Sequence, residues 1–510
     1  MMRARWWESR WFALAAILLA AVPLLLPTFP PLADLPGHVG RYHIAQAIDG
    51  SPDLARHWRF EWALIGNLGV DLLVHALAPL LGVEGATRLI VTLIPPLFVA
   101  GLILVTRATG LPLSPAAGFA FPLAYCFPFQ FGFVNFMLSV ALALHALALW
   151  IWLGRTGRVV LRTFLLIPVS CVLWLAHSSG WGLFGLLAFA SEVQLLRSTG
   201  TSWSAAAVRA TLRCVPLALP VAAMLGSGTA GEPPSWDFTA KLAWIASLLR
   251  ERWKLYDVAS AIVVASVLWM AIRDRRVRFD PVIGASAAIA FVAYLLLPRL
   301  ALGGAYVDMR IVGPATALAL VAVRVRPGSE RFERGLAIAA AAFLLMRTLT
   351  STVAMLLVAQ PQQRALEVVE AIPRGAAVLV LVNEPCSSQW STRRLGHIAG
   401  IAIARRDLFT NDQWTLAGQQ ALDHRHPGAA PYTSDPSQLV YPAQCEYRTT
   451  EFATAIRDFD RSTFTHVWTL DFPARRRLAP DVRLIWSNGV SALYAVDGAP
   501  TRLPGGAAPQ

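Results

Sequence analysis

About eleven apolar runs, separated by polar loops, constrain this chain more than any other feature of its sequence. An apolar run of roughly 20 residues is long enough to cross the hydrocarbon core of a bilayer as a helix. Because lipid offers no hydrogen-bond partner to an open backbone, repeated runs of this length predict a polytopic α-helical membrane protein. The expected spans are 11–29, 86–106, 112–128, 134–153, 163–179, 180–196, 212–228, 257–272, 281–298, 311–324 and 335–358.

Composition agrees with this class. Of the 510 residues, 56% are hydrophobic and 15% are charged, whereas a soluble domain averages about 45–50% and about 25%. The net charge of +13 is compatible with nucleic-acid binding, but the basic residues fall in short clusters between apolar runs. We therefore interpret them as topology signals and expect no nucleic-acid partner.

The arginines predict the orientation of the spans. With a cytoplasmic N-terminus, every loop on that side carries arginine, whereas the opposite loops have mixed charge, as the positive-inside rule requires. The first run is long for a signal peptide and is followed by further spans, so we expect a retained helix. An odd number of spans places the C-terminal segment outside, which predicts a multi-pass protein of a bacterial inner membrane with a periplasmic tail.

Three parts are expected along the chain. Residues 1–358 form a transmembrane domain whose first external loop, 30–85, contains amphipathic stretches at Gly40–Ile48 and Asn67–Leu81. Residues 359–500 form a small periplasmic domain, and 501–510 a disordered tail. A second external loop, 229–256, combines tryptophans with basic residues and is interpreted either as a lipid-headgroup site or as a plain interfacial anchor.

The segment 359–500 alternates expected helices with strands, which is typical of a small α/β domain. Residues 420–450 are expected to be an extended loop. No glycine-rich phosphate loop, nucleophile motif or metal-spaced His/Cys cluster is present, so we expect neither a cofactor nor a metal. The helices are Gln363–Ile372 and Glu451–Phe459, and the strands Ala377–Val382, Thr465–Leu470, Arg483–Trp486 and Ala492–Val496, the last two forming a hairpin around Asn488-Gly489.

Cys386 and Cys445 are the cysteines of this segment. A periplasmic location permits a disulfide between them, and two free thiols are an equal alternative.

The first external loop opens with Pro31-Leu32-Ala33-Asp34-Leu35-Pro36-Gly37-His38, directly after the first span. The prolines restrict the backbone and hold the Asp34 carboxylate near the membrane surface. A carboxylate there could act as a general base, with His38 close enough to share the site and Arg41 available to bind substrate. The alternative is a charged residue on a solvated turn.

Polar candidates also occur near the ends of other spans. Gln130 and Asn135 lie in an aromatic turn and could bind a sugar, or the turn could serve helix packing alone. Asp308 and Arg310 lie just outside the tenth span, where the guanidinium could hold a phosphate or pair with a neighbouring charge.

His177 and Arg347 lie within the spans, His177 close to the outer surface and Arg347 near the middle of the last one. A charge at that depth costs about 2.5–3.5 kcal/mol and normally faces a cavity or a partner. Substrate binding and structural pairing both remain open for these two side chains.

The second span begins with Gly82-Val83-Glu84-Gly85-Ala86-Thr87-Arg88-Leu89. The layout of this region resembles the GT-C class of integral-membrane glycosyltransferases, which includes lipid A aminoarabinose transferases and protein O-mannosyltransferases. The shared features are an acidic residue just after the first helix, the amphipathic segments that follow it, and the Gly82–Leu89 sequence at the start of the second span. The resemblance covers most of the chain in layout and residues 31–107 in detail. It implies that Asp34 is the catalytic base or the group that orients the acceptor. Many members carry a second acidic residue beside it, where this chain has Leu35.

The resemblance implies a glycosyltransferase that moves a sugar, with inversion, from a polyprenyl-phosphate carrier to a lipid, glycan or protein acceptor at the periplasmic face. Two alternatives remain: a non-catalytic GT-C-like scaffold in envelope assembly, and a lipid or sugar transporter. A transporter predicts paired internal repeats, and no clear repeat is present in the sequence.

Overall fold

The structure is a computed structural model, which describes residues 5–226, 233–301, 304–386, 390–391, 394–415, 420–433, 435–442, 445 and 451–498. The expected disordered tail, 501–510, lies outside the described residues, as do parts of the loops 229–256 and 420–450. The chain divides into two compact units. The first unit comprises Met1–Leu26, Leu64–Val70 and Leu89–Ala354, and the second unit comprises Pro27–Ala63, Asp71–Arg88 and Met355–Gln510.

Within the described residues, six helices are long and apolar enough to cross a membrane. They agree with six of the spans expected from the sequence, and the chain is a membrane protein. Three shorter apolar helical segments, Arg10–Leu25, Pro281–Leu296 and Met309–Val321, match three more. The six are α5 (Gly69–Ala108), α8 (Val134–Arg155), α9 (Val159–Ala176), α10 (Ser178–Ser198), α14 (Lys254–Arg273) and Glu330–Ala371, which joins α17 (Glu330–Leu366) to the 3-10 turn η4 (Glu367–Ala371).

Two expected spans are broken into short pieces. Residues 112–128 form α6 (Ala117–Ala120), η2 (Phe121–Tyr125) and the start of α7 (Phe127–Phe131), and residues 212–228 include the end of α11 (Trp203–Cys214), η3 (Val215–Ala218) and α12 (Pro220–Gly226). Each of four of these pieces begins with a proline in its first turn, where the missing N–H needs no partner. Pro122 and Pro128 lie at the starts of η2 and α7, and Pro216 and Pro220 at those of η3 and α12. The total of eleven spans therefore stays a prediction.

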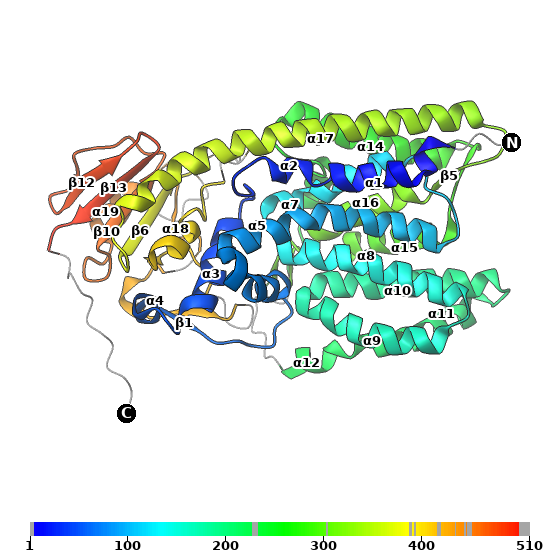
Figure 1. Cartoon of the computed structure of the whole chain (residues 1–510), viewed down its shortest axis with the longest axis horizontal. Helices are drawn as coiled ribbons and strands as arrows, with labels where there is room; N and C mark the ends of the chain where they lie inside the picture. Colours follow the sequence, from blue (N-terminus) through cyan, green and yellow to red (C-terminus); the bar gives the residue numbers. More distant parts are fainter. Residues whose placement is uncertain are drawn as a thin grey trace. The chain divides into compact units, whose positions relative to one another are not determined.

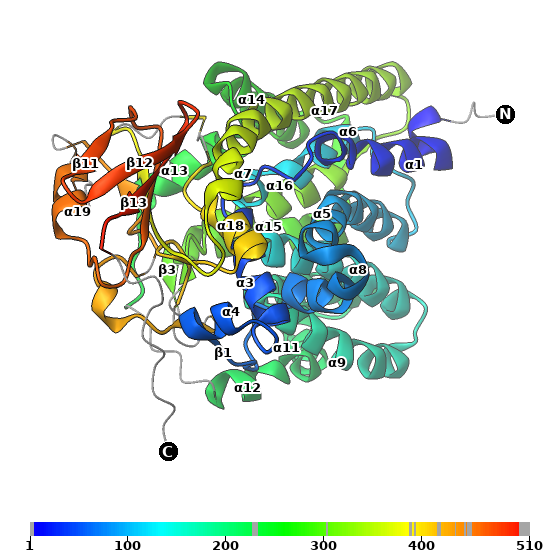
Figure 2. The same ribbon diagram turned by 60° about the vertical axis from the view of Figure 1, so that its left-hand side comes forward.

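The helices of the first unit pack through small residues. α8 contacts α9 and α10, α10 contacts α15 (Pro281–Leu296), and α15 contacts α16 (Met309–Val321) (Figures 1 and 2). A Cβ on Gly180 of α10 would lie 2.5 Å from Ser139 Cβ on α8, and a Cβ on Gly118 would lie 2.5 Å from the Ala340 carbonyl oxygen. Such close approach is the main means by which helices associate in lipid, where no hydrophobic drive holds them together.

Short elements complete the first unit. They are η1 (Trp6–Glu8), α1 (Arg10–Leu19), α2 (Val22–Leu25), α13 (Phe238–Ala246), the pair β2 (Val277–Phe279) with β5 (Val323–Val325), and the pair β3 (Leu300–Ala301) with β4 (Gly304–Ala305).

The second unit is built on a sheet with the strand order β11-β12-β13-β10-β6-β7, and β9 also pairs with β6. β10 runs parallel to β6 and antiparallel to β13, and the hairpin β12–β13 turns at Asn488-Gly489 as the sequence predicts (Figure 1). The strands are β6 (Ala377–Asn383), β7 (Phe409–Thr410), β9 (Leu439–Val440), β10 (His466–Leu470), β11 (Arg477–Ala479), β12 (Val482–Ser487) and β13 (Ser491–Val496). The expected C-terminal helix is present as α19 (Phe452–Asp458).

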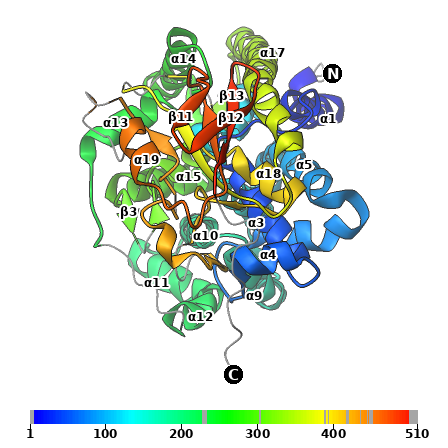
Figure 3. The ribbon, with the colours of Figure 1, turned by 90° about the vertical axis from the view of Figure 1, so that its left-hand side faces the viewer.

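Residues 27–63 belong to this same unit. They form α3 (Leu35–Ala47), α4 (Pro52–His57) and β1 (Trp58–Phe60), and β1 pairs with β8 (Leu422–His424), next to the short turn η5 (Pro427–Ala429). α3 lies along α18 (Ala399–Arg406) (Figure 3). Residues Asp71–Arg88, which lie within α5, also belong to this unit. α5 is kinked there at Gly82, whose φ of 70° is a left-handed conformation that favours glycine.

Glycines allow α3 and α18 to meet. A Cβ on Gly400 would overlap the Pro36 carbonyl oxygen and would lie 2.8 Å from Gly37 Cα, and a Cβ on Gly40 would lie 3.0 Å from Gly400 Cα. Backbone therefore contacts backbone at this crossing, and no side chain larger than hydrogen fits.

We expect Gly400→Ala to destabilise the second unit by at least the cost of overpacking, about 1–3 kcal/mol, because the obstacle is backbone and cannot rotate away. Thermal unfolding of the detergent-solubilised protein measures this. Gly50→Ala is the matched control, since its Cβ would meet only the Ala47 carbonyl oxygen at 3.8 Å. Equal unfolding midpoints for the two variants would contradict the packing argument.

Candidate functional site

Asp34 lies at the start of α3, where it precedes the first helical residue. Pro36 in the first turn supplies a helical φ without needing an N–H partner, which explains why the helix begins here. The side chain keeps 14% of its surface exposed, and Asp34 Oδ1 lies 3.9 Å from Nε2 of His397. The structure thus pairs the expected catalytic carboxylate with a residue about 360 positions along the chain.

His397 is buried and is held by several groups of the second unit. Its Nδ1 lies 3.2 Å from the main-chain oxygen of Asp412, and its Nε2 lies 3.5 Å from Oδ1 of Asp435. The Trp414 ring covers it at a centroid distance of 4.3 Å. Sequence reasoning missed His397, Asp412 and Asp435, because they lie in loops that no local motif marks.

Three carboxylates surround the His397 ring. Burial is the largest single influence and lowers the pKa of His397, but Asp435, Asp34 and Asp412 together outweigh it and leave this pKa above the ordinary value. Burial likewise raises the pKa of Asp412, whose Oδ1 accepts a hydrogen bond from Thr410 and whose Oδ2 has no hydrogen-bond partner among the described residues.

His38 and Arg41 follow on α3 and differ in their surroundings. The His38 ring stacks on Trp414 at 5.0 Å and on Tyr42 at 6.1 Å, so His38 and His397 contact the same indole. Arg41 is buried, donates from Nε to Asp71 Oδ1 at 2.8 Å and from Nη1 to Gln420 at 2.6 Å, and these bonds fix its guanidinium within the second unit.

Arg347 of the first unit lies in a buried network. Its guanidinium is 3.0 Å from Glu251 Oε2 and 3.0 Å from Asp257 Oδ1, and it also donates to the Leu249 carbonyl oxygen. Gln130 donates to Glu251 Oε1 at 3.0 Å, and Ser351 donates to the same oxygen. These contacts engage both candidates with protein groups.

Asn135 and Asp308 are also engaged. Asn135 Oδ1 accepts the main-chain N–H of Val70 at 2.6 Å, and its amide nitrogen donates to Asn67, which secures the start of α5. Asp308 caps α16 through the N–H of Met309 and pairs with buried Lys241 at 3.0 Å.

His177 and Arg310 form a pair in the first unit. Arg310 Nη1 lies 2.8 Å from His177 Nε2, Nη2 donates to the Ala305 carbonyl oxygen, and the guanidinium lies over the Phe133 ring at 4.4 Å. Arg310 is half-buried. A phosphate oxygen is a suitable ligand for such a group.

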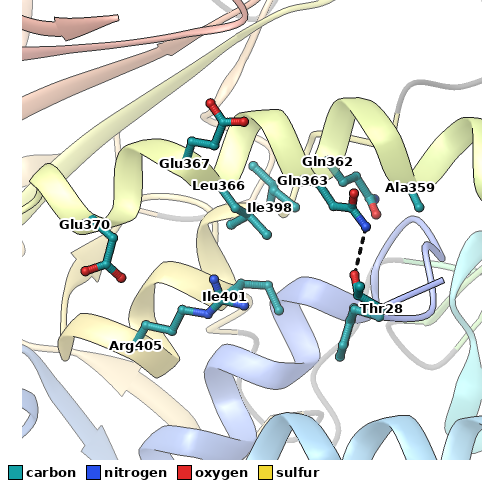
Figure 4. A pocket seen from close by; sticks show the side chains of 11 residues that line it. Thr28, Ala359, Gln362, Gln363, Leu366, Glu367, Glu370, Ile398, Ile401 and Arg405 are labelled. Carbon is teal, nitrogen blue, oxygen red and sulfur yellow. Dashed lines mark hydrogen bonds between the residues drawn. The ribbon is translucent and has the colours of Figure 1, made fainter. Parts of the chain in front are cut away.

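A pocket of about 300 Å³ lies in the second unit between the C-terminal part of α17, α18 and the segment before α3 (Figure 4). This size is at the lower end of small-ligand sites. Gln363 donates to Thr28 across one end of it at 2.8 Å. The pocket shares its segments with the Asp34 site, because Ile398 follows His397 and Phe29 shortly precedes Asp34. Its lining comprises Thr28, Phe29, Ala359, Gln362, Gln363, Leu366, Glu367, Glu370, Ile398, Ile401 and Arg405.

Cys386 and Cys445 form a disulfide across 59 positions of the chain. Cys126, Cys171 and Cys214 are free. Among the described residues, no group of three or more His, Cys, Asp or Glu side chains could hold a metal ion.

Comparisons with known proteins place the fold. No family model matches the chain, and no curated protein matches it in sequence. The crystal structure of ArnT from Cupriavidus metallidurans in the apo state is similar, with a TM-score of 0.50, 14% identity, and 95% of this chain and 97% of that one covered. A structure of the same protein bound to undecaprenyl phosphate gives a TM-score of 0.48 at 14% identity, with the same coverage. The chain has the GT-C fold expected from the sequence.

We expect Arg347→Met to lower the stability of the first unit by about 3–5 kcal/mol, because it leaves Glu251 and Asp257 as buried charges without their cation. The yield of monodisperse protein in size-exclusion chromatography and its thermal midpoint measure this. Arg334→Met, an exposed position on the same helix, is the control. Adding Glu251→Gln to Arg347→Met should recover part of the loss, and equal behaviour of the two single variants would show that the network contributes little.

Proposed function

We propose that this protein is a membrane glycosyltransferase that transfers a sugar from a polyprenyl-phosphate carrier to an acceptor at the periplasmic face. The observation that carries the proposal is the Asp34 carboxylate, which stands at the start of α3 and 3.9 Å from His397, in a chain with the fold of ArnT. A partly exposed carboxylate is suited to binding an acceptor hydroxyl.

The reaction is an inverting displacement. The acceptor oxygen forms a bond to the anomeric carbon while the bond from that carbon to the phosphate oxygen breaks, and the phosphate leaves with the electron pair. Asp34 takes the proton of the acceptor hydroxyl, or it orients that hydroxyl while the leaving phosphate takes the proton. Positive charge near the phosphate stabilises the developing anion. His38 lies on the next turn of α3, where its ring stacks on Trp414 and helps to define the wall of the site.

Arg310 is the candidate for the carrier phosphate. Its guanidinium is half-buried, lies over the Phe133 ring at 4.4 Å, and contacts His177 Nε2 and the Ala305 carbonyl oxygen. A guanidinium presents parallel N–H groups that match two phosphate oxygens. ArnT has been crystallised bound to undecaprenyl phosphate, which makes this lipid a suitable first probe for the present chain.

The proposed topology places the N-terminus in the cytoplasm and the second unit in the periplasm. The arginine pattern of the loops supports this orientation. The disulfide between Cys386 and Cys445 supports it independently, because disulfides persist in the periplasm and are rare in the cytoplasm.

We expect Asp34→Asn to abolish formation of the glycosylated product, because an amide neither takes a proton nor carries the charge that orients the hydroxyl. Glycolipid and glycan analysis of the deletion strain, complemented with wild type or variant at equal membrane levels, measures this. Asp49→Asn, at an exposed carboxylate just after the same helix, is the control. Full restoration by Asp34→Asn would leave the scaffold and transporter alternatives in place of the enzyme.

We expect the Cys386–Cys445 bond to form in cells. After denaturation with an alkylating reagent and no reductant, mass spectrometry should find Cys126, Cys171 and Cys214 alkylated and the other two cysteines joined in one cross-linked peptide. Alkylation of Cys386 and Cys445 to the same extent as the other three would place the second unit in a reducing compartment and would overturn the topology.

A further inference from the structure

His397 has a place in the structure that the proposed reaction does not yet use. We propose that His397 is a positioning residue for Asp34: as an imidazolium it holds the Asp34 carboxylate in its working orientation, and loss of its proton at alkaline pH releases that carboxylate. The proposal rests on the proposed function for its effect on transfer, but its structural part can be tested without any sugar substrate.

The Nδ1 atom of the His397 ring faces a main-chain carbonyl oxygen. Nδ1 lies 3.2 Å from the main-chain oxygen of Asp412. A carbonyl oxygen only accepts, so Nδ1 carries a proton and donates it. If the ring were neutral, its Nε2 would therefore be the unprotonated atom with an exposed lone pair.

The Nε2 atom of the His397 ring faces two carboxylates. It lies 3.9 Å from Asp34 Oδ1 and 3.5 Å from Asp435 Oδ1. A lone pair facing two carboxylate oxygens is repulsive, whereas an N–H⁺ attracts both. The geometry alone thus favours the imidazolium, and the raised pKa of His397, in which burial is outweighed by Asp435, Asp34 and Asp412, agrees with it.

The fold fixes the distance between His397 and Asp34. Arg394, three residues before His397, donates to the carbonyl oxygen of Pro31, three residues before Asp34, at 2.6 Å. Three residues after His397, Gly400 meets the backbone of Pro36 and Gly37. His397 and Asp34 are therefore bracketed on both sides by contacts between their own segments, which places them face to face.

The partners of the ring are themselves held. Gln438 donates to Asp435 Oδ1 at 3.1 Å and to the Gly396 carbonyl oxygen at 2.9 Å, so it ties Asp435 to the residue before His397. Thr410 donates to Asp412. The charged groups that face the ring are thus Asp34 from the start of α3, Asp412 from the loop after β7 and Asp435 from the loop before β9.

The charge of His397 affects sugar transfer through the position of Asp34. With a cation between them, Asp34 and Asp435 hold a defined separation, and Asp34 presents its carboxylate to the acceptor hydroxyl. When His397 loses its proton, the two carboxylates repel each other and Asp34 turns away. Because the pKa is raised, this loss falls above the ordinary histidine value of about 6.5, so transfer declines on the alkaline side.

The structural test is NMR of the full-length protein in detergent with isotope-labelled histidine. The His397 ring signals are assigned by their absence from His397→Gln. We expect both ring nitrogens to be protonated on the acid side of a titration midpoint that lies above about 6.5 and that falls in Asp34→Asn and in Asp435→Asn. A midpoint at or below the ordinary value, or one unaffected by both variants, overturns the proposal.

The functional test uses the complemented deletion strain grown at several values between about pH 5 and about pH 8. We expect His397→Gln to lower the glycosylated product by about 10- to 100-fold, as a small misplacement of a reacting group does, and to remove the alkaline decline seen with wild type. His466→Gln, a histidine of β10 in the same unit, is the control and should keep the wild-type profile.

The outcomes separate the two claims. If Asp34→Asn abolishes the product and His397→Gln leaves its amount and its pH profile unchanged, the function stands and the role of His397 is wrong. If Asp34→Asn leaves the product intact, the proposed function is wrong, and the NMR titration alone decides whether His397 is the cation between the two carboxylates.

Discussion

The contact between α3 and α18 is the constraint on which the candidate site depends. Gly37, Gly40 and Gly400 bring backbone against backbone, so the two helices cross at a separation that no other residue permits. Asp34 precedes the first of these glycines and His397 the last. A larger residue at this crossing would move the two side chains apart, and neither helix carries the site by itself.

Buried charge organises the first unit in a different way. Arg162 pairs with Glu192 at 2.6 Å, Lys241 with Asp308 at 3.0 Å, and Arg347 with Glu251 and Asp257. A lone charge in a low-dielectric interior costs several kcal/mol, so each of these cations has its own carboxylate. Two of these charged side chains, Asp308 and Arg347, are also candidates for substrate binding, and the structure shows that protein groups already contact them.

The two units also differ in how far local sequence predicts them. Apolar composition and length identify the long spans, because a helix that crosses the lipid must be apolar over about 20 residues. The strands and the Asn488-Gly489 hairpin follow from strand-forming runs and turn chemistry. The expected spans 112–128 and 212–228 were continuous only in hydropathy. Both are divided into short helical pieces, since hydropathy measures transfer into lipid and does not measure hydrogen bonding along the backbone.

By itself the sequence determined the membrane class, the GT-C layout, most of the helices and strands, and Asp34 as the residue of interest. The tertiary structure alone decided what surrounds it. His397, Asp412, Trp414 and Asp435 lie more than 360 residues from Asp34 and carry no motif, so only the folding of the C-terminal segment onto residues 27–63 brings them together. It also decided that Arg41, Gln130 and Arg347 are already paired, because burial and partner distances depend on contacts that no single stretch of sequence contains.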